Sequence, residues 1–413
     1  MIKNTRHRVK HEIHQAAEPG AMEDVFDGDR YCRLRNAQVN EHSEYKFFDN
    51  PDDIAIGLGT DGFSMFKRRH TGNSTAWPLI LVKYNLHPSI WNWLENVICV
   101  GVIPGPKESS KVASQEDQID GDGAYFVLHA FLIIIFGDIP AISKLLLLKG
   151  HNRKSACRAC LFQGTPHVGD NGNVTYYVPL ATPNRQVVQL PEDLPMRGHN
   201  TFLFYYDALE AAERGARAEL QTECGLNAQP LFTRLKSIDL SSCALYELMH
   251  LFLENLVLNM LMHWKGTFKS IADDPAYRIS AQDWKTIGEL TEQALWIIPG
   301  QFAGTLPNIG TDMGLYKAEA FSFWFMYLAP ILLNGQLART FRHFLAMCEI
   351  FIWCLNMKIT PEQVNELEIM IREWVQEYKR LYYRYKHDQL IGSQQRVHYA
   401  YSLLGCYDAL ACM

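Results

Sequence analysis

The chain has 413 residues, of which 48% are apolar and 12% aromatic, and its 39 Lys and Arg against 45 Asp and Glu give a net charge of −6. This composition excludes global disorder and supports a sizeable hydrophobic core, in two or three domains or one large one. Ten cysteines are too few for a disulfide scaffold, the N-terminus lacks the apolar segment of a secretory signal, and no apolar run is long enough to cross a membrane. We therefore expect an intracellular protein with reduced thiols and no membrane association.

The predicted elements begin with an α/β part that follows a polar, poorly ordered lead-in over residues 1–50. Short apolar segments bounded by Gly and Pro predict four strands, at residues 54–63, 75–86, 97–103 and 125–136. The fourth strand is apolar almost throughout, which is typical of a strand that is buried on both faces. A helix that starts near Pro140 and ends at Gly150 follows it.

The rest of the chain carries a helical period. Helices are predicted at residues 205–221, 245–264, 316–334, 337–357 and 361–388. The last of these opens with Thr360, Pro361 and Gln363, a capping-box pattern. We divide the chain into the lead-in (1–50), the first part of an α/β core (51–163), a mainly helical insertion (164–310) and C-terminal helices that complete the core (311–413).

Two carboxylates stand at the ends of predicted strands. Asp61 follows the first strand and Asp138 follows the fourth. Two such side chains that converge on one point could hold a pair of divalent cations for phosphodiester chemistry. The alternative is two ordinary turn aspartates, because Asp-Gly and Gly-Asp are common at strand ends.

A Cys-x-x-Cys turn, Cys157 to Cys160, lies in a basic, loop-like stretch. Two thiolates at this spacing can bind one tetrahedral Zn²⁺, with further ligands from elsewhere, such as His250 or His263. A redox pair or inert thiols are the alternatives, but the motif does not open a helix after a strand as a thioredoxin-like motif would. His250, taken alone on an apolar helix, is as well explained by core packing.

A third acid is less clearly marked. Glu319 opens an otherwise apolar helix, where the helix dipole is a sufficient structural reason for it. Glu254 is a competing acid on an earlier helix, four residues from His250 and on the same face.

Three blocks of sequence resemble one family. They are TDGFSMFKRRHTGNSTAWPLILVKYNLHPSI from Thr60, IIIFGDIPAISKLLLLKGHNRKSACRAC from Ile133 and MHLFLENLVLNMLMHW from Met249. In this order they resemble the Tnp2 transposases of CACTA (En/Spm) DNA transposons, in their fungal form. The resemblance runs from about Asp49 to about Leu390.

This resemblance implies an RNase H-like mixed sheet interrupted by a mainly helical insertion, with a helical C-terminal region. It implies metal-dependent cleavage and strand transfer at transposon ends, with double-stranded DNA as partner, a nuclear location and a possible homo-oligomer. The residues that match the family pattern are the triad Asp61, Asp138 and Glu319, which would hold Mg²⁺ or Mn²⁺, and the zinc-like set Cys157, Cys160 and His250. We take Glu319 rather than Glu254 as the third acid, and expect it to approach the two aspartates.

Basic residues follow the first acid. Lys67, Arg68 and Arg69 are candidates for phosphate contacts, although a solvated hairpin turn explains them equally well.

Two departures from the family pattern support a different function. Residues 107–123 are short and acidic where the family has a longer segment with a helix, and the chain stops where members usually continue. The alternative is therefore a catalytically inactive, truncated transposase-derived protein, stabilised by zinc, that binds DNA or protein. An intracellular zinc protein of unrelated function is a further alternative.

Overall fold

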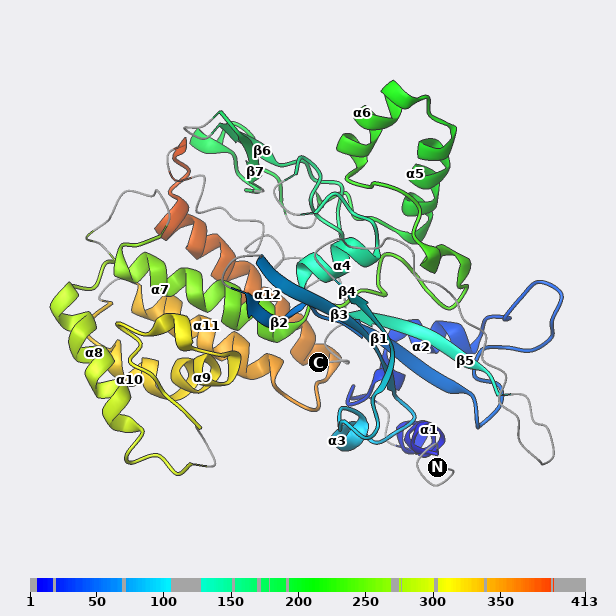
Figure 1. The fold of residues 1–413 in the computed structure, drawn as a ribbon, viewed down its shortest axis with the longest axis horizontal. Coiled ribbons are helices and arrows are strands. Elements are labelled where there is room, and N and C mark those ends of the chain that lie inside the picture. Colours follow the sequence, from blue (N-terminus) through cyan, green and yellow to red (C-terminus); the bar gives the residue numbers. More distant parts are fainter. Residues whose placement is uncertain are drawn as a thin grey trace.

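The computed structural model describes residues 6–389 except 18–19, 69–71, 105–127, 151–152, 169–171, 178, 191–192, 269–274, 276, 301–303, 338–339 and 388. The described part is a mixed α/β structure with a helical C-terminal region. Figure 1 shows the sheet at the centre, with α1 and α3 below it, α5 and α6 above it, and α7 to α12 gathered on one side.

The central sheet is mixed. Its strands are β1 (Ile54–Thr60), β2 (Phe63–Arg68), β3 (Gly72–Lys83), β4 (Ile98–Pro104) and β5 (Ala130–Phe136). β1 and β2 pair antiparallel with one edge of β3, and β4 pairs antiparallel with the other edge. β5 runs parallel to β1 on its free side, with Gly59 opposite Phe136. The four predicted strands are confirmed by β1, β3, β4 and β5, although β1 ends at Thr60 and β5 begins at Ala130. β2, which starts where the first predicted strand was expected to end, was not predicted.

The apolar run of β5 explains its place inside the sheet. Phe131 and Ile133 belong to the core on one face, while Ile135 belongs to the core on the other. A short segment adds to the outer edge of β5: Ile135 donates to the carbonyl of Cys243 at 2.7 Å and accepts from Leu245 at 3.3 Å. This parallel bridge joins two parts of the chain that are far apart in sequence.

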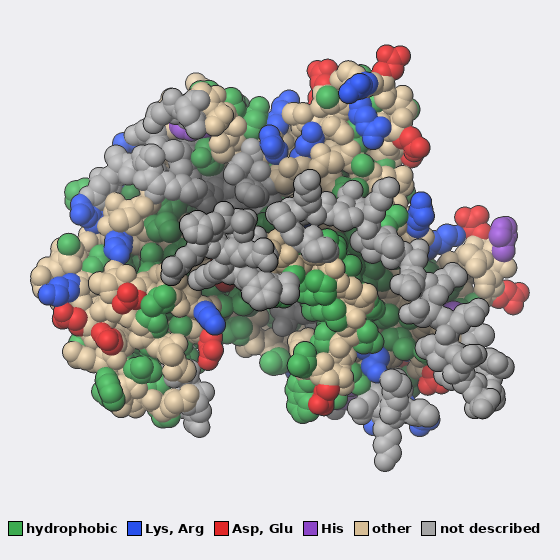
Figure 2. Space-filling view, viewed as in Figure 1, with side chains coloured by type: hydrophobic (Ala, Val, Ile, Leu, Met, Phe, Trp, Pro, Cys, Tyr) green, Lys and Arg blue, Asp and Glu red, His purple; other side chains and the backbone are tan. Residues whose placement is uncertain are grey.

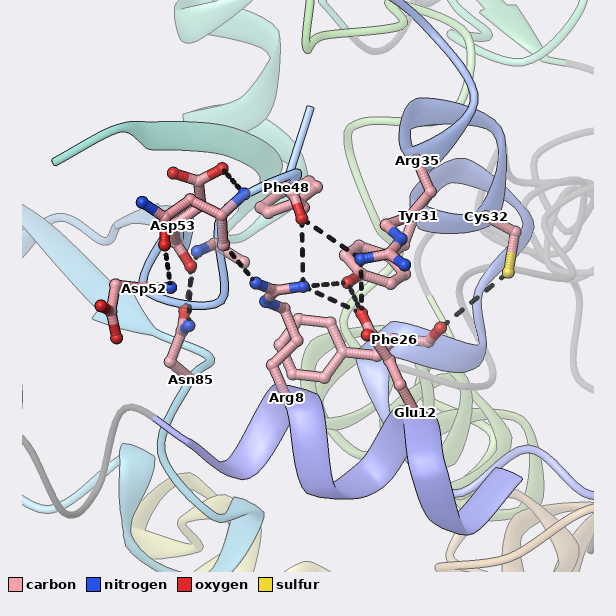
Figure 3. A network of polar contacts seen from close by, with 12 residues as sticks. Arg8, Glu12, Phe26, Tyr31, Cys32, Arg35, Phe48, Asp52, Asp53 and Asn85 are labelled. Carbon is pink, nitrogen blue, oxygen red and sulfur yellow. Dashed lines mark hydrogen bonds and ion pairs between the residues drawn. The ribbon is translucent and has the colours of Figure 1, made fainter. Parts of the chain in front are cut away.

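The N-terminal region differs from the poorly ordered lead-in that we expected. It forms α1 (His7–Ala17), the 3-10 turn η2 (Val25–Asp27) and α2 (Asp29–Arg35), which cover one face of the sheet. Arg8 is buried and donates to the hydroxyl of Tyr31 at 3.0 Å and to the backbone carbonyl of Asn50 at 2.7 Å (Figure 3). A polar segment is therefore ordered because its charged groups bind backbone and side chains far along the chain.

The segment between β5 and the C-terminal helices is mainly helical. Its elements, together with the short helix α3 (Pro88–Trp91) before it, are α4 (Ile139–Leu145), β6 (Thr165–Val168), β7 (Val174–Tyr177), η3 (Pro183–Arg185), α5 (His199–Ala211), α6 (Arg214–Cys224) and η5 (Leu231–Arg234). The helix predicted over 205–221 is two helices, because the chain is extended at Ala212 and Glu213. α4, α5 and α6 contribute to the core on the face of the sheet opposite α1 and α2.

The C-terminal region is helical as predicted, with an additional helix, α8. Its elements are the π-helix η6 (Met249–Val257), α7 (Leu258–Lys265), α8 (Ala281–Ala294), η7 (Met313–Leu315), α9 (Ala318–Phe323), the π-helix η8 (Trp324–Leu328), α10 (Ala329–Leu332), α11 (Phe341–Cys354), α12 (Pro361–Tyr378) and the π-helix η9 (Lys379–Tyr383). Thr360 caps α12, and its backbone N–H donates to Gln363 at 2.9 Å, so the predicted capping box is confirmed. Among the described helices, none is both long and apolar enough to span a bilayer.

Candidate acidic site at the carboxyl ends of β1 and β5

The two predicted strand-end aspartates lie at neighbouring positions of the sheet. In the parallel pairing of β1 with β5, Gly59 lies opposite Phe136, so Asp61 and Asp138 each follow by two residues at the carboxyl ends of adjacent strands. Asp61 is exposed and Asp138 is half-buried. The register therefore places both residues at the same end of the sheet. Among the described residues, the two aspartates do not form a group with Glu254 or Glu319 in which all ligand atoms lie within 4.8 Å of one another.

Gly137 explains how closely the strand ends approach each other. Its φ of +157° lies in a region that favours glycine, and a Cβ at this position would stand 2.5 Å from the carbonyl oxygen of Thr60. A side chain here would push the two strand ends apart. The ammonium of Lys144 from α4 lies 3.8 Å from the ring centroid of Trp77, which packs against Gly62, so α4 also reaches the turn that carries Asp61.

Asp138 begins α4. Its Oδ1 accepts a hydrogen bond from the backbone N–H of Ala141 at 2.6 Å, as an N-cap residue does, and Pro140 occupies the first turn as predicted. The cap fixes the orientation of the carboxyl group and leaves Oδ2 for another ligand.

A histidine and two glutamates lie near Asp138. Nδ1 of His250 hydrogen-bonds Glu247, and its Nε2 lies 3.8 Å from Glu254. The hydrogen bond from Glu247 raises the pKa of His250 to about 9, against the opposing effect of burial, and the charges of Glu247, Glu254 and Asp138 add to the rise. His250 is therefore protonated at neutral pH and adds a positive charge among these acids.

Glu247 holds the start of the π-helix. Its carboxylate accepts from the backbone N–H of Met249 at 3.0 Å and of His250 at 2.8 Å. Burial opposes ionisation, but these hydrogen bonds and the one from the imidazole lower the pKa of Glu247. Glu247 was not among the predicted site residues, although its place three residues before His250, one helical turn away, was a signal for such a pair.

Glu319 lies in the first turn of α9 and is exposed. α9 packs against the π-helix that carries His250 and Glu254. Glu254 and Asp138 both act on His250, because the charge of each raises the pKa of its imidazole. Among the described interactions, none joins Glu319 to Asp61 or Asp138. Our preference for Glu319 as the third acid stays a prediction.

The Cys-x-x-Cys turn is buried. Cys157 and Cys160 are 2% and 1% exposed, and the hydrogen bond from Cys157 together with burial raises the pKa of the Cys160 thiol. The guanidinium of Arg197 donates to the backbone carbonyls of both cysteines at 3.1 Å and to that of Cys224 at 2.8 Å, which ties the turn to the end of α6.

His250 does not complete a zinc set with these cysteines. Both of its ring nitrogens face carboxylates. In the part of the chain that the structure describes, a different group has its three ligand atoms within 4.8 Å of one another: His7, His11 and Asp24. A zinc site at Cys157 and Cys160 stays a prediction, and His250 is better placed at the acidic site.

The basic candidates end β2. The backbone of Lys67 and Arg68 forms the last two residues of that strand, while their side chains, and Arg69 altogether, lie outside the described residues, as does the segment 107–123. Figure 2 shows basic and acidic side chains interspersed over the described part of the visible face. The described surface in this view has no extended basic area for a DNA backbone.

The donor set at the strand ends suits a hard divalent cation. Carboxylate oxygens are the ligands of Mg²⁺ and Mn²⁺, and the two aspartates stand on rigid elements, one strand end and one capped helix. No protein-family model matches this chain, and no curated protein matches it significantly. The geometry alone therefore supports the functional proposal.

Proposed function

We propose that the chain is a transposase-like enzyme that cleaves and joins DNA with divalent metal ions, on an RNase H-like core. One observation carries the proposal: the register of β1 with β5 brings Asp61 and Asp138 to adjacent carboxyl ends of parallel strands. The close approach of the two strand ends at Gly137 supports a shared role for the two aspartates, whereas the alternative is a turn residue at Asp61 and a helix cap at Asp138.

The strand arrangement supports the RNase H-like part of the proposal. β1, β3 and β4 are antiparallel neighbours, and the later strand β5, which precedes the second acid, returns parallel to β1. The helices from α4 onward follow this strand, whereas α1, α2 and α3 precede it. This is the order expected from the resemblance to Tnp2 transposases: three strands, a fourth with the second acid, and then helices.

The chemistry follows from the side chains. Asp61 and Asp138 would hold Mg²⁺ or Mn²⁺, which activates water or a 3′-hydroxyl and stabilises the leaving oxygen of a phosphodiester. The cap hydrogen bond holds the carboxyl group of Asp138 in one orientation, so metal binding would cost little side-chain conformational entropy. The proposed substrate is double-stranded DNA at transposon ends, and the proposed location is the nucleus.

The charge of His250 favours the alternative of a catalytically inactive, transposase-derived protein. A protonated imidazole beside Asp138 and Glu254 already offsets negative charge where a metal would bind. If that offset keeps metal out, the chain is a transposase-derived binding protein without nuclease activity.

The test is a nicking assay with Mg²⁺ on a duplex that carries the sequences flanking the coding region. We expect Asp61→Asn to abolish metal-dependent nicking, because it removes a ligand charge at an exposed position without disturbing the core. Asp52→Asn is the matched control, an exposed aspartate before the other end of β1. Equal nicking by wild type and Asp61→Asn would refute the assignment, and no nicking by wild type with either Mg²⁺ or Mn²⁺ would support the inactive alternative.

The third acid needs its own comparison. Glu319→Gln and Glu254→Gln each remove one carboxylate from exposed positions. Loss of nicking in Glu319→Gln alone would support our assignment, whereas loss in Glu254→Gln alone would transfer the role to the residue that contacts His250.

A further inference from the structure

Two histidines on α1 face two aspartates of the following turn. His7 and His11 are one helical turn apart, so their imidazoles lie on the same side of the helix, with ring centroids 5.9 Å apart. Nε2 of His7 lies 2.7 Å from Oδ2 of Asp24, and Nε2 of His11 lies 2.7 Å from Oδ1 of Asp27. Neither histidine belongs to the site at the ends of β1 and β5.

The ligand atoms are close enough for one metal ion. One atom each from His7, His11 and Asp24 lie within 4.8 Å of one another. Around a tetrahedral Zn²⁺ at about 2.0–2.2 Å from each ligand, such atoms stand roughly 3.3 Å apart. Metal binding would therefore draw the more distant ligand atoms together by up to about 1.5 Å and widen the 2.7 Å contact between His7 and Asp24.

The surroundings of the cluster hold its carboxylates in place. Asp24 and His11 are 2% and 7% exposed, while His7, at 17%, forms the open side. Oδ2 of Asp27 accepts from the backbone N–H of Glu23 at 2.8 Å and of Asp24 at 2.9 Å, so this carboxylate is fixed while its other oxygen orients His11. A carboxylate that orients a ligating imidazole is the usual outer support of a metal site.

We propose that His7, His11 and Asp24 form a Zn²⁺ site that clips α1 to the turn containing η2. Two imidazoles and one carboxylate are ligands that Zn²⁺ accepts, whereas Mg²⁺ and Ca²⁺ prefer oxygen alone. Three protein ligands leave the fourth position to water. The proposal is independent of the nuclease proposal, because it involves different residues and requires no catalysis.

The first experiment measures zinc bound per chain after metal stripping and titration with Zn²⁺. We expect the His7→Gln/His11→Gln variant to bind one ion fewer than wild type, and His14→Gln to bind as wild type does. His14 is the matched control, since it lies on the same helix but is 49% exposed, 3.3 Å from Glu23. Because the readout is a difference, any zinc held at Cys157 and Cys160 cancels.

The second experiment uses the unaltered protein, in case the double variant does not fold. Carbethoxylation of histidines, followed by mass spectrometry, should slow at His7 and His11 by about tenfold or more when Zn²⁺ is added, because bound imidazole nitrogens cannot react, and should be unchanged at His14. Mg²⁺ should protect none of them. Equal zinc content in all three proteins, or equal modification with and without Zn²⁺, would overturn the proposal.

Discussion

Replacing Arg8 with methionine is expected to lower the free energy of unfolding by about 2–3 kcal/mol. Arg8 is 1% exposed, and its Nη1 lies 2.9 Å from Oε1 of Glu12 and 3.0 Å from the hydroxyl of Tyr31. Its Nη2 donates to the carbonyl of Asn50 at 2.7 Å (Figure 3). Methionine keeps much of the buried aliphatic stem, so the loss comes from the charged group.

The magnitude follows from what remains after the substitution. Removing one partner of a buried ion pair costs about 3–5 kcal/mol when the other charge is left alone. Here Glu12 is 26% exposed and keeps contacts to Tyr31 and, at 3.3 Å, to Arg35. The carbonyl of Asn50 still accepts from the backbone of Asp53. The loss of unfolding free energy should therefore be about 2–3 kcal/mol, at or below the low end of the range for a buried ion pair.

The assay is urea unfolding followed by tryptophan fluorescence at pH 7. Arg33→Met is the matched control, since Arg33 is 54% exposed and forms an i,i+4 pair with Asp29 at 2.8 Å, which should be worth about 0.5 kcal/mol or less. If Arg8→Met differs from Arg33→Met by less than about 0.5 kcal/mol, the buried network does not stabilise the N-terminal region as we argue.

Three further predictions concern the two candidate sites. Asp138→Ala should destabilise the protein by about 1 kcal/mol through loss of the α4 cap, whereas Asp138→Asn should keep the cap yet lose metal-dependent nicking; equal stability of the two variants would contradict the cap argument. The double variant Cys157→Ser/Cys160→Ser should bind less zinc than wild type and be less stable; an unchanged zinc content by metal analysis would refute a zinc site at these cysteines. The pKa of His250 is raised from 6.5 to about 9, so the stabilisation by its charge is fully present below about pH 6 and is lost as the pH rises through about 9. Glu247→Gln loses one backbone acceptor at every pH, and its cost in urea unfolding should be about 1–2 kcal/mol larger at pH 6 than at pH 10; a cost that does not depend on pH would contradict the prediction.

Local signals predicted the elements whose causes are local. The apolar run of β5, the start of α4 near Pro140 and the cap at Thr360 depend on residues within a few positions of each other, and all three are present as expected. The cap that Asp138 forms on α4 was not predicted. The order of the N-terminal region was missed because Arg8 binds the carbonyl of Asn50, a partner that no local pattern reveals.

The same distinction between local and long-range causes applies to the candidate site. The positions of Asp61 and Asp138 after apolar strands were predictable, whereas the parallel pairing of those strands was not, because it joins segments that are far apart in the sequence. The contact of His250 with Glu247 was visible as a one-turn spacing, but its position near Asp138 depends on the tertiary placement of the π-helix, which packs against α7 and α9. Sequence spacing cannot fix that arrangement.

The bridge between β5 and the segment at Cys243 to Leu245 has a consequence for folding during synthesis. β5 leaves the ribosome well before this segment, and the hairpin β6–β7 and helices α5 and α6 are made in between. Until then the outer edge of β5 presents unpaired backbone groups beside an apolar run, which is a template for pairing with another chain. Slow synthesis between the two segments should therefore lower the yield of soluble protein more than slow synthesis after Leu245.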